Sequence, residues 1–197
     1  MTAAMSPFPL VEEAGFGVPH AYLHATAGAR LAEHAGEPVR VEIDSQTRPS
    51  TGVQVIGRRA GADPAAGTVV VSAHIDSKPD TPGAIDNAAG VAVMLAVADL
   101  LRDREIAPTV EFVPFNGEDH TLAPGELAYL AARPDLSGIR VALNIDAPGL
   151  PGSPTAYSGY GLDADTEALA NADVPAILDT ALLAETARYI AELVAGL

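Results

Sequence analysis

The residues best suited to chemistry in this chain stand at the ends of three short apolar runs. TVVVSAHID closes on His74 and Asp76, TVEFVPFNGED closes on Glu118 and Asp119, and IRVALNID closes on Asp146. Short apolar runs bounded by turn residues are typical of buried parallel strands. Ligands of open α/β sheets bind beyond the carboxyl ends of such strands. We therefore predict that these imidazole and carboxylate groups meet at one sheet edge, where their types suit a metal ion.

A fourth polar element lies between the first two runs. The segment GAIDNAAGVAVMLAVADLLRD places Asp86 and Asn87 just ahead of a long apolar helix. Both residue types are favoured as helix N-caps, and capping by itself would explain them. Asp86 also lies 12 residues after His74, in the loop that joins the first run to this helix. That position favours a metal-binding role at the same edge of the sheet.

The elements that must position these groups alternate between strands and helices. We expect strands at 39–44, 53–59 and 68–75 and in the two later apolar runs, and helices at 88–104, 124–130 and about 180–195. Strands that alternate with helices predict the α/β class. The expected architecture is a three-layer α/β/α sandwich around a mostly parallel, mixed sheet.

In order and residue type these motifs resemble the co-catalytic di-zinc exopeptidases, a family that includes bacterial leucyl aminopeptidases, glutamate carboxypeptidase and glutaminyl cyclase. The resemblance covers roughly residues 50–150, and its four stretches are His74-x-Asp76-Ser77, Gly83-Ala84-x-Asp86-Asn87-Ala88, Glu118-Asp119 and Asn144-Ile145-Asp146. It implies a zinc-exopeptidase-like fold. It also implies a metallo-aminopeptidase that releases N-terminal amino acids from peptides or amino-acid derivatives by metal-activated water.

The resemblance assigns metal ligands to four residues. His74 and Asp146 would hold one Zn²⁺, Asp86 would bridge two ions, and Asp119 would bind the second ion. Most relatives carry Glu where this chain has Asp119, and the shorter side chain still reaches a metal if the backbone moves slightly. One or two zinc ions are therefore implied.

The resemblance also assigns two residues that act beside the metal. Glu118 would be the general base that takes a proton from the attacking water. Asp76 would hydrogen-bond the second ring nitrogen of His74 and so fix its tautomer. The peptide bond corresponding to Asp86–Asn87 is often cis in this family, which makes that bond a candidate for the same geometry.

The chain departs from the family near its C-terminus. The family's last ligand is a His shortly before the final helix, usually preceded by a Tyr, whereas the five histidines here are at positions 20, 24, 34, 74 and 120. The segment 174–179 runs directly into TALLAETARYIAELVAGL. We therefore expect a deletion of about 60 residues, judged against the usual size of a single domain. The second metal site then lacks a ligand, and catalysis is expected to be slow at best.

Several groups could replace the missing ligand. His120 follows Asp119 directly, although the neighbour of a ligand usually points away from the ligand's metal. Four carboxylates lie in a later acidic stretch more typical of solvated loop: Asp163, Asp165, Asp173 and Asp179. A partner subunit is a third source, and a sheet edge uncovered by the deletion would favour a homodimer. The sequence does not decide among these sources.

Composition limits the partners and the metal. The 197 residues fit one domain, preceded by an N-terminal segment at 1–38 that loosely resembles the tail of a protease-associated insert; residues 39–197 would form the catalytic domain. The chain has no cysteine, so nitrogen and oxygen must ligate any metal, which suits Zn²⁺, Mn²⁺ or Co²⁺. A net charge of −15 argues against nucleic acid and anionic membranes as partners. No stretch is expected to approach the roughly 20 apolar residues of a membrane span.

The sequence leaves more than one possibility open for the protein's location and for its function. The start MTAAMSPFPLVEEAGFG lacks the basic region and apolar core of a signal peptide. We expect a cytoplasmic protein as written, or a secreted one if an upstream segment has been lost. Besides the aminopeptidase, we consider a catalytically impaired or non-catalytic module with the same fold, which the missing His favours. A third reading is a glutaminyl-cyclase-like or amidohydrolase relative with a changed substrate pocket.

Overall fold

The computed structural model describes residues 23–42, 44, 49–78, 81–119, 123–149 and 181–197. The chain divides into two compact units, Met1–Thr51 and Gly52–Leu197. The first unit contains helix α1 (Ala25–Ala32), and the second contains the strands and the remaining helices. The domain boundary expected after residue 38 stays a prediction.

Four strands of the second unit form one mixed sheet. They are β1 (Gly57–Arg59), β2 (Thr68–His74), β3 (Thr109–Phe115) and β4 (Ile139–Asn144), in the spatial order β1-β3-β2-β4. β2 runs parallel to both β3 and β4, and β1 pairs antiparallel with β3. His74 lies opposite Phe115, and Ser72 lies opposite Asn144. The three parallel strands therefore end together, and the residues that follow them emerge at one edge.

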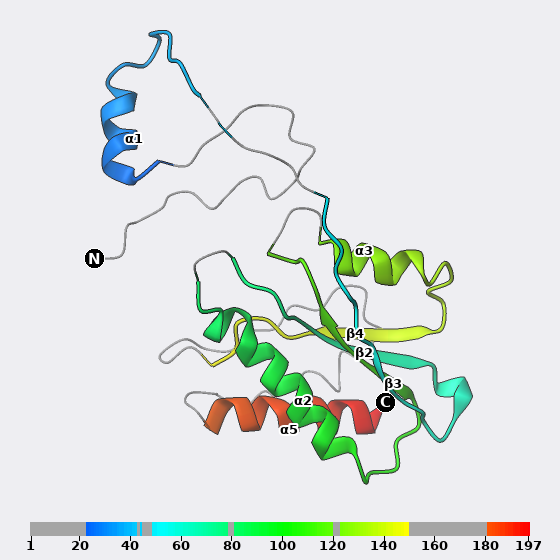
Figure 1. The fold of residues 1–197 in the computed structure, drawn as a ribbon. Helices are drawn as coiled ribbons and strands as arrows, with labels where there is room; N and C mark the ends of the chain where they lie inside the picture. The colour runs from blue at the N-terminus through cyan, green and yellow to red at the C-terminus, as the bar shows by residue number, and fades with distance from the viewer. Residues whose placement is uncertain (1–22, 43, 45–48, 79–80, 120–122, 150–180) are drawn as a thin grey trace. The chain divides into compact units, whose positions relative to one another are not determined.

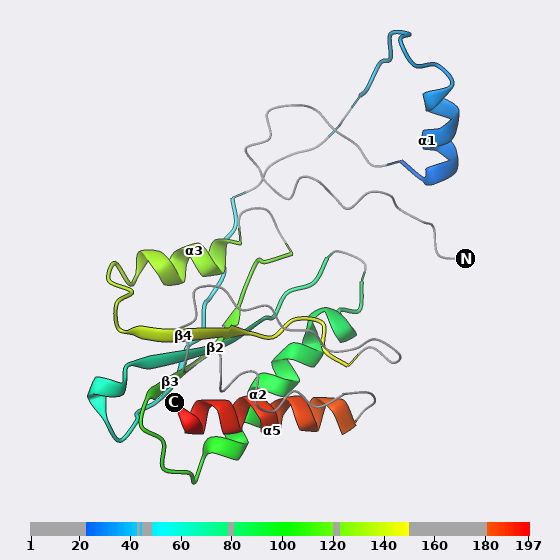
Figure 2. The same ribbon diagram turned by 180° about the vertical axis from the view of Figure 1, so that it is seen from behind.

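Helices cover both faces of this sheet (Figures 1 and 2). Helices α2 (Gly90–Leu101) and α5 (Ala181–Gly196) lie on one face, and α3 (Pro124–Ala131) lies on the other. Two short helical segments complete the unit, η1 (Pro64–Ala66) and η2 (Ala84–Ala89). The three-layer sandwich with a mostly parallel, mixed sheet is confirmed.

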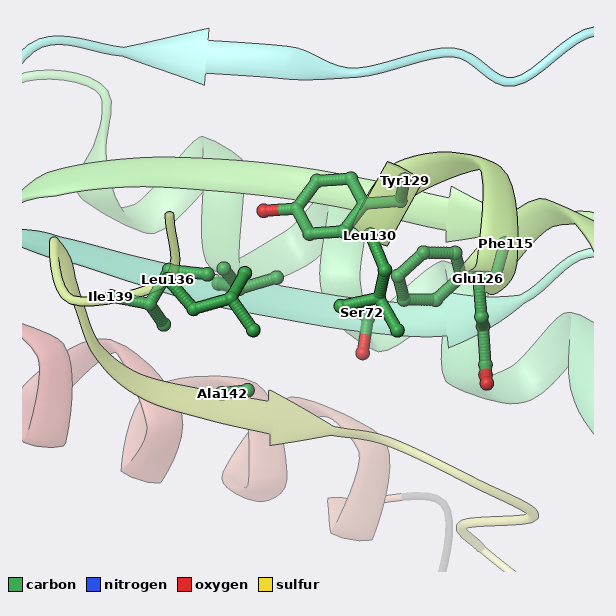
Figure 3. A pocket seen from close by; sticks show the side chains of 9 residues that line it. Ser72, Phe115, Glu126, Tyr129, Leu130, Leu136, Ile139 and Ala142 are labelled. Atoms are coloured by element: carbon green, nitrogen blue, oxygen red, sulfur yellow. The ribbon is translucent and has the colours of Figure 1, made fainter. Parts of the chain in front are cut away.

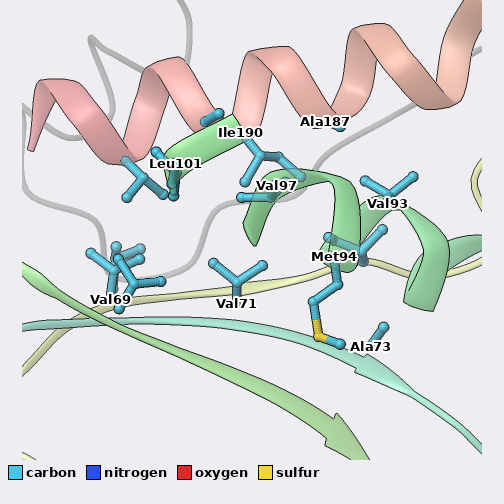
Figure 4. Close-up of a cluster of buried hydrophobic side chains, with 14 of the residues drawn as sticks. Val69, Val71, Ala73, Val93, Met94, Val97, Leu101, Ala187 and Ile190 are labelled. Carbon is cyan, nitrogen blue, oxygen red and sulfur yellow. The ribbon is translucent and has the colours of Figure 1, made fainter. Parts of the chain in front are cut away.

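The larger apolar core fills the space between the sheet and α2 and α5 (Figure 4). Alternate residues of β2 point into it, because successive side chains of a strand face opposite sides. Fully buried members from strands and helix include Val69, Val71, Ala73, Val97 and Leu101. Burying such an aliphatic side chain contributes about 1.5–3 kcal/mol, so this layer is the main source of stability in the described unit.

The opposite face of the sheet has a smaller apolar cluster and more polar chemistry. Three side chains of the sheet and one of α3 pack together there: Val70, Val113, Phe115 and Tyr129. Beside them lies a hollow with a mostly apolar lining (Figure 3). Ser72 and Glu126 contribute polar groups to this lining, and its apolar side chains include Leu130, Leu136, Ile139 and Ala142.

A buried carboxylate anchors α3 to this second face. Glu111 of β3 accepts a hydrogen bond of 2.8 Å from the hydroxyl of Tyr129 and bonds of 2.6 and 2.7 Å from the guanidinium of Arg133. The guanidinium also lies 4.8 Å from the centroid of the Tyr129 ring. Burial would raise the pKa of Glu111, but the bonds from Arg133 and Tyr129 outweigh it and hold that pKa below its usual value. Burial, and then the bond to Glu111, raise the pKa of Tyr129 to about 12.

The sequence-based elements need three corrections. The strand expected at 39–44 is wrong for the residues described there, because 39–42 and 44 form no strand. The strand expected at 53–59 is reduced to Gly57–Arg59, the stretch that pairs with β3. The helix expected at 88–104 begins at Gly90 and ends at Leu101. An alternating pattern makes a strand only where a neighbour covers its apolar side, and Val39 and Val41 are both exposed.

One described stretch, Ala84–Leu101, is long and apolar enough to span a membrane by length and composition, with a mean hydropathy of 1.7 over 18 residues. This corrects the expectation that no stretch approaches such a span. The backbone is non-helical at Asp86 and Asn87 within it, and α2 buries Val93 and Val97 in the core. Buried core helices satisfy the same criterion, so the run is weak evidence for a membrane, and the absence of a membrane partner stays a prediction.

Candidate metal centre

His74 supplies the nitrogen at the centre of the site. It is the last residue of β2, and its side chain is only 3% exposed. Its Nε2 atom lies 2.8 Å from Oδ1 of Asp86, 3.4 Å from Oδ1 of Asp146 and 3.9 Å from Oε2 of Glu118. Three carboxylates from three different loops thus converge on one buried ring nitrogen, as predicted from the strand endings for Glu118 and Asp146 and from the loop before the helix for Asp86.

The donor set fits a divalent cation. Nε2 of His74 is buried and makes no hydrogen bond of acceptable geometry, although buried polar atoms are nearly always satisfied. The ligand atoms of His74, Asp86 and Asp146 all lie within 4.8 Å of one another. Burial lowers the pKa of His74, but the charges of Asp146, Glu118 and Asp86 outweigh it and leave the pKa raised. This excess of negative charge attracts a proton to the imidazole, and it attracts a metal ion in the same way.

Asp86 reaches the site from a sharp turn before α2. Gly83 adopts a left-handed conformation with φ of 60°, and the backbone leaves the helical region at Asp86 and Asn87. The peptide bond between these two residues is cis, as the resemblance implied. The Asp86 carboxylate caps no helix and instead lies beside His74, so the metal-ligand interpretation fits it better than the capping one.

Asn87, the neighbour of Asp86, holds the loop that carries Asp146. Its buried amide donates to the carbonyl of Ile145 at 2.9 Å and accepts from the N–H of Ala147 at 3.2 Å. The same oxygen accepts from the N–H of Gly90 at 3.0 Å, as an N-cap does. Asn87 therefore bonds to the first residue of α2, although the N-cap position of that helix is Ala89. Its bonds on both sides of Asp146 were not foreseen, because they join residues 58 and 60 positions apart.

Asp76 holds the turn that carries Glu118 and Asp119. Its carboxylate accepts hydrogen bonds from three consecutive backbone N–H groups, those of Gly117 at 2.8 Å, Glu118 at 3.1 Å and Asp119 at 3.1 Å. Gly117 has φ of 94°, a left-handed value that glycine tolerates best. The turn is therefore fixed by a carboxylate two residues after His74 in the sequence.

The expected bond between the Asp76 carboxylate and His74 needs a correction. Nδ1 of His74 lies 3.0 Å from the backbone carbonyl of Asp76 and 3.7 Å from its carboxylate. The carbonyl is thus the hydrogen-bond acceptor that places the proton on Nδ1 and leaves Nε2 free for a metal. The carboxylate is directed to the turn, where three donors satisfy it better than one ring nitrogen would.

Gln54 supports the same turn from the sheet edge, and sequence reasoning missed it. Its amide donates to the carbonyl of Pro114 at 2.7 Å and accepts from the N–H of Asn116 at 3.2 Å. These are backbone groups of β3 and the turn after it that β1 would satisfy if it began a few residues earlier than Gly57. A lone glutamine in an expected strand carries no signal of this role.

Asp119 belongs to a second ligand set that shares His74 with the first, and it lies beside a lysine. A second set of ligand atoms within 4.8 Å joins His74, Glu118 and Asp119. Nζ of Lys78 lies 3.4 Å from Oδ1 of Asp119, whose side chain is 6% exposed. The structure therefore brings all six predicted site residues together, and it gives Asp119 a cationic neighbour that was not anticipated.

Two of the other candidate ligands lie in the first unit, and the rest lie outside the described residues. His24 and His34 lie in the first unit, where His24 accepts from the N–H of Thr26 at the start of α1 and His34 lies 3.3 Å from Glu37. The remaining candidates lie outside the described residues: His20, His120, Asp163, Asp165, Asp173 and Asp179.

Comparisons with known proteins agree with this geometry. The model of peptidase family M28 matches residues 54–192. Aminopeptidase YwaD of Bacillus subtilis is 35% identical over 83 residues, which are 41% of this chain and 18% of that protein. The chain spans only 10% to 18% of the length of the curated relatives it matches.

Two solved structures resemble the described fold. The aminopeptidase from Aneurinibacillus sp. strain AM-1 matches with a TM-score of 0.52 and 20% identity, over 68% of this chain and 36% of that chain. BSAP, a zinc aminopeptidase from Bacillus subtilis, matches with a TM-score of 0.45 and 31% identity, over 49% of this chain and 24% of that chain. The first supports the α/β fold alone.

Proposed function

Since the chain belongs to peptidase family M28, we propose that it is a zinc-dependent aminopeptidase. The observation that carries the proposal is the buried Nε2 of His74, which makes no hydrogen bond of acceptable geometry and faces the carboxylates of Asp86, Asp146 and Glu118. The relatives named as aminopeptidases support the reaction class. Mn²⁺ or Co²⁺ would suit the same nitrogen and oxygen ligands.

His74, Asp86 and Asp146 would hold the ion. When bound, zinc would act as a Lewis acid toward the scissile carbonyl and would lower the pKa of water. His74 would contribute its neutral imidazole to the ion, because its Nδ1–H can donate to the carbonyl of Asp76 and Nε2 is then left for the metal. Asn87 ties the Asp86 loop to the Asp146 loop through two bonds, and a third bond ties it to the first residue of α2. The ligands are thus held in place by the fold before an ion arrives.

Glu118 is positioned to move the proton. Its carboxylate lies 3.9 Å from Nε2 of His74, and its side chain is 39% exposed. It would take a proton from the attacking water and return it to the leaving amine. Asp76 holds the backbone of this residue, so the base keeps its place while its side chain stays accessible to water and substrate.

The surplus of negative charge suits a substrate with a free α-amino group. The carboxylates of Asp86, Asp146 and Glu118 all remain partly exposed. An ammonium group at the substrate's N-terminus would pair with a carboxylate that the metal does not neutralise, which places the first peptide bond at the centre. A blocked N-terminus would lose this attraction, so we expect free peptides and amino-acid derivatives to be the substrates.

Replacement of Glu118 by Gln tests the proposal. The amide keeps the size of the side chain but cannot take a proton, so turnover of amino-acid anilides should fall by roughly 10²–10⁴-fold. Zinc content after dialysis should stay unchanged. Glu105→Gln, a matched change at an exposed glutamate beyond the far end of α2, should leave the rate unaltered. Hydrolysis unaffected by Glu118→Gln would exclude Glu118 as the base.

A non-catalytic metal-binding module is the second candidate function. It is favoured by the single histidine that the described part of the chain brings to the centre and by the lysine beside Asp119. Such a module would bind zinc through His74, Asp86 and Asp146 and show no hydrolysis of anilides or dipeptides at any zinc concentration. Zinc binding together with slow, Glu118-dependent turnover would instead support the aminopeptidase.

A further inference from the structure

Lys78 carries a positive charge into an acidic cluster. It is the only lysine in the chain, and its Nζ atom lies 3.4 Å from Oδ1 of Asp119. The Lys78 side chain is 47% exposed, whereas that of Asp119 is 6% exposed. The ammonium therefore reaches from solvent to a carboxylate that lies almost wholly inside the cluster.

The two sets of potential ligands compete for one imidazole. His74 belongs both to the set with Asp86 and Asp146 and to the set with Glu118 and Asp119. Its Nε2 faces Asp86 at 2.8 Å, and its Nδ1 lies 3.0 Å from the Asp76 carbonyl. Once the first set has an ion, the second set keeps two carboxylates and no described nitrogen. One of those carboxylates already pairs with the ammonium.

We propose that Lys78 takes the place of a second metal ion. Its ammonium neutralises Asp119 and repels a divalent cation from the second set, so the centre holds one ion, at His74, Asp86 and Asp146. The inference rests on the proposed function, because it takes the first set as the zinc site. A chain that lost this lysine would acquire a second, weaker zinc site built on Asp119 and Glu118.

The proposed role of Lys78 and that of an ordinary surface ion pair predict different effects on metal binding. Exposed pairs contribute about 0–1 kcal/mol to stability, so either reading expects a small effect of Lys78 on the melting temperature. The affinity for a second cation separates them. A unit charge and a divalent ion several ångströms apart in watery surroundings repel by enough to change binding by roughly tenfold.

Calorimetric zinc titration of the dialysed full-length chain, with a competing chelator, is the test. Wild type should bind one equivalent tightly. Lys78→Met should bind a second equivalent roughly tenfold more tightly than wild type does, the size expected from the lost repulsion. Lys78→Arg should behave as wild type because it keeps the charge. Adding Asp119→Asn to Lys78→Met should abolish the gain.

Arg102→Met is the matched control for overall charge. Arg102 pairs with Asp99 at the far end of α2, about 18 Å along the helix from its start at 1.5 Å per residue. This variant should bind zinc as wild type does. An equal gain in Arg102→Met would overturn the inference, because any lost cation would then act alike.

Two further results would overturn the inference alone while the first site stands. One is a wild type that already holds two zinc ions tightly, and the other is a Lys78→Met variant whose second equivalent is no tighter than that of wild type. A wild type that binds no zinc at all would instead overturn the proposed function together with the inference. A second variant, Lys78→Gln, should reproduce the Lys78→Met result with a polar side chain.

Discussion

The two faces of the sheet bury different chemistry, although the same strands supply both. Toward α2 and α5, β2 presents Val69, Val71 and Ala73 to an apolar core. Toward α3, the alternate positions of β2 are Val70, Ser72 and His74, and Ser72 and His74 are among the few buried polar side chains. Period-two alternation along one strand therefore separates a layer that stabilises the fold from a layer that carries the site.

The difference teaches how the polar groups are kept in place. Apolar side chains pack without direction, but a buried carboxylate or imidazole must be satisfied by particular partners. On the α3 face and at its carboxyl edge, Glu111, Asp76 and Asn87 each bind two or more groups from other elements. We infer that the apolar face supplies most of the stability, and the polar groups fix the loops that bear the ligands.

The strongest way to break this comparison is to remove the partner of a buried charge. Arg133→Met leaves Glu111 buried without its main counter-charge, which should lower the free energy of unfolding by about 3–5 kcal/mol at neutral pH. Urea denaturation measures it. The matched control is Arg104→Met, which breaks the exposed pair with Glu192 and should cost about 0–1 kcal/mol. Equal losses in the two variants would contradict the account.

The same variant has a pH dependence of known sign. Because the pKa of Glu111 is lowered in the folded chain, its ionised form stabilises the fold above the ordinary carboxyl pKa of 4.5. That stabilisation is lost as the pH falls through the lowered value. In Arg133→Met the buried Glu111 keeps only the hydroxyl of Tyr129 and the more distant Arg58, at 3.8 Å, so burial then favours its neutral form more strongly. The gap in stability between wild type and variant should therefore be largest near pH 7 and should shrink in acid.

The apolar face should respond differently to a cavity. Leu101→Ala removes a side chain that is fully buried in the core and should cost about 2–5 kcal/mol. This loss of stability should be the same at pH 7 and at pH 5, since Leu101 packs in an apolar cluster and its removal uncovers no titratable side chain. The neighbouring Leu100 is exposed, so Leu100→Ala should change stability by less than about 1 kcal/mol. A loss of stability in Leu101→Ala that varied between pH 7 and pH 5 would contradict the distinction between the two faces of the sheet.

The smallest effect on stability should come from Gln54. Gln54→Leu removes the bonds to Pro114 and Asn116 and should cost about 1 kcal/mol. Because it loosens the turn that carries Glu118, it should lower kcat by roughly tenfold, with KM and zinc affinity unchanged. Gln54→Glu keeps the acceptor for Asn116 and loses only the donor. Its kcat should therefore lie between that of wild type and that of Gln54→Leu. A change in KM alone would argue against a positioning role.

The sequence was sufficient to predict the strands and the site residues wherever an apolar run ends in a side chain that can bind a metal. The apolar runs ending at His74, Phe115 and Asn144 are strands, the first buried on both sides and the last buried mainly at Val141, and the residues that follow them meet as predicted. The pattern at 39–44 failed because alternation does not specify a partner strand. The roles of Asp76 and Gln54 could not be read, since both depend on backbone groups that only the fold brings near.

The most direct test of the central claim, one metal ion held by His74, Asp86 and Asp146, is a crystal structure of the zinc-loaded chain with data collected at the zinc absorption edge. The account predicts one anomalous peak per chain. That peak should lie about 2.0–2.2 Å from Nε2 of His74 and from carboxylate oxygens of Asp86 and Asp146, with Lys78 beside Asp119. Two peaks of equal height, or a single peak away from His74, would contradict it.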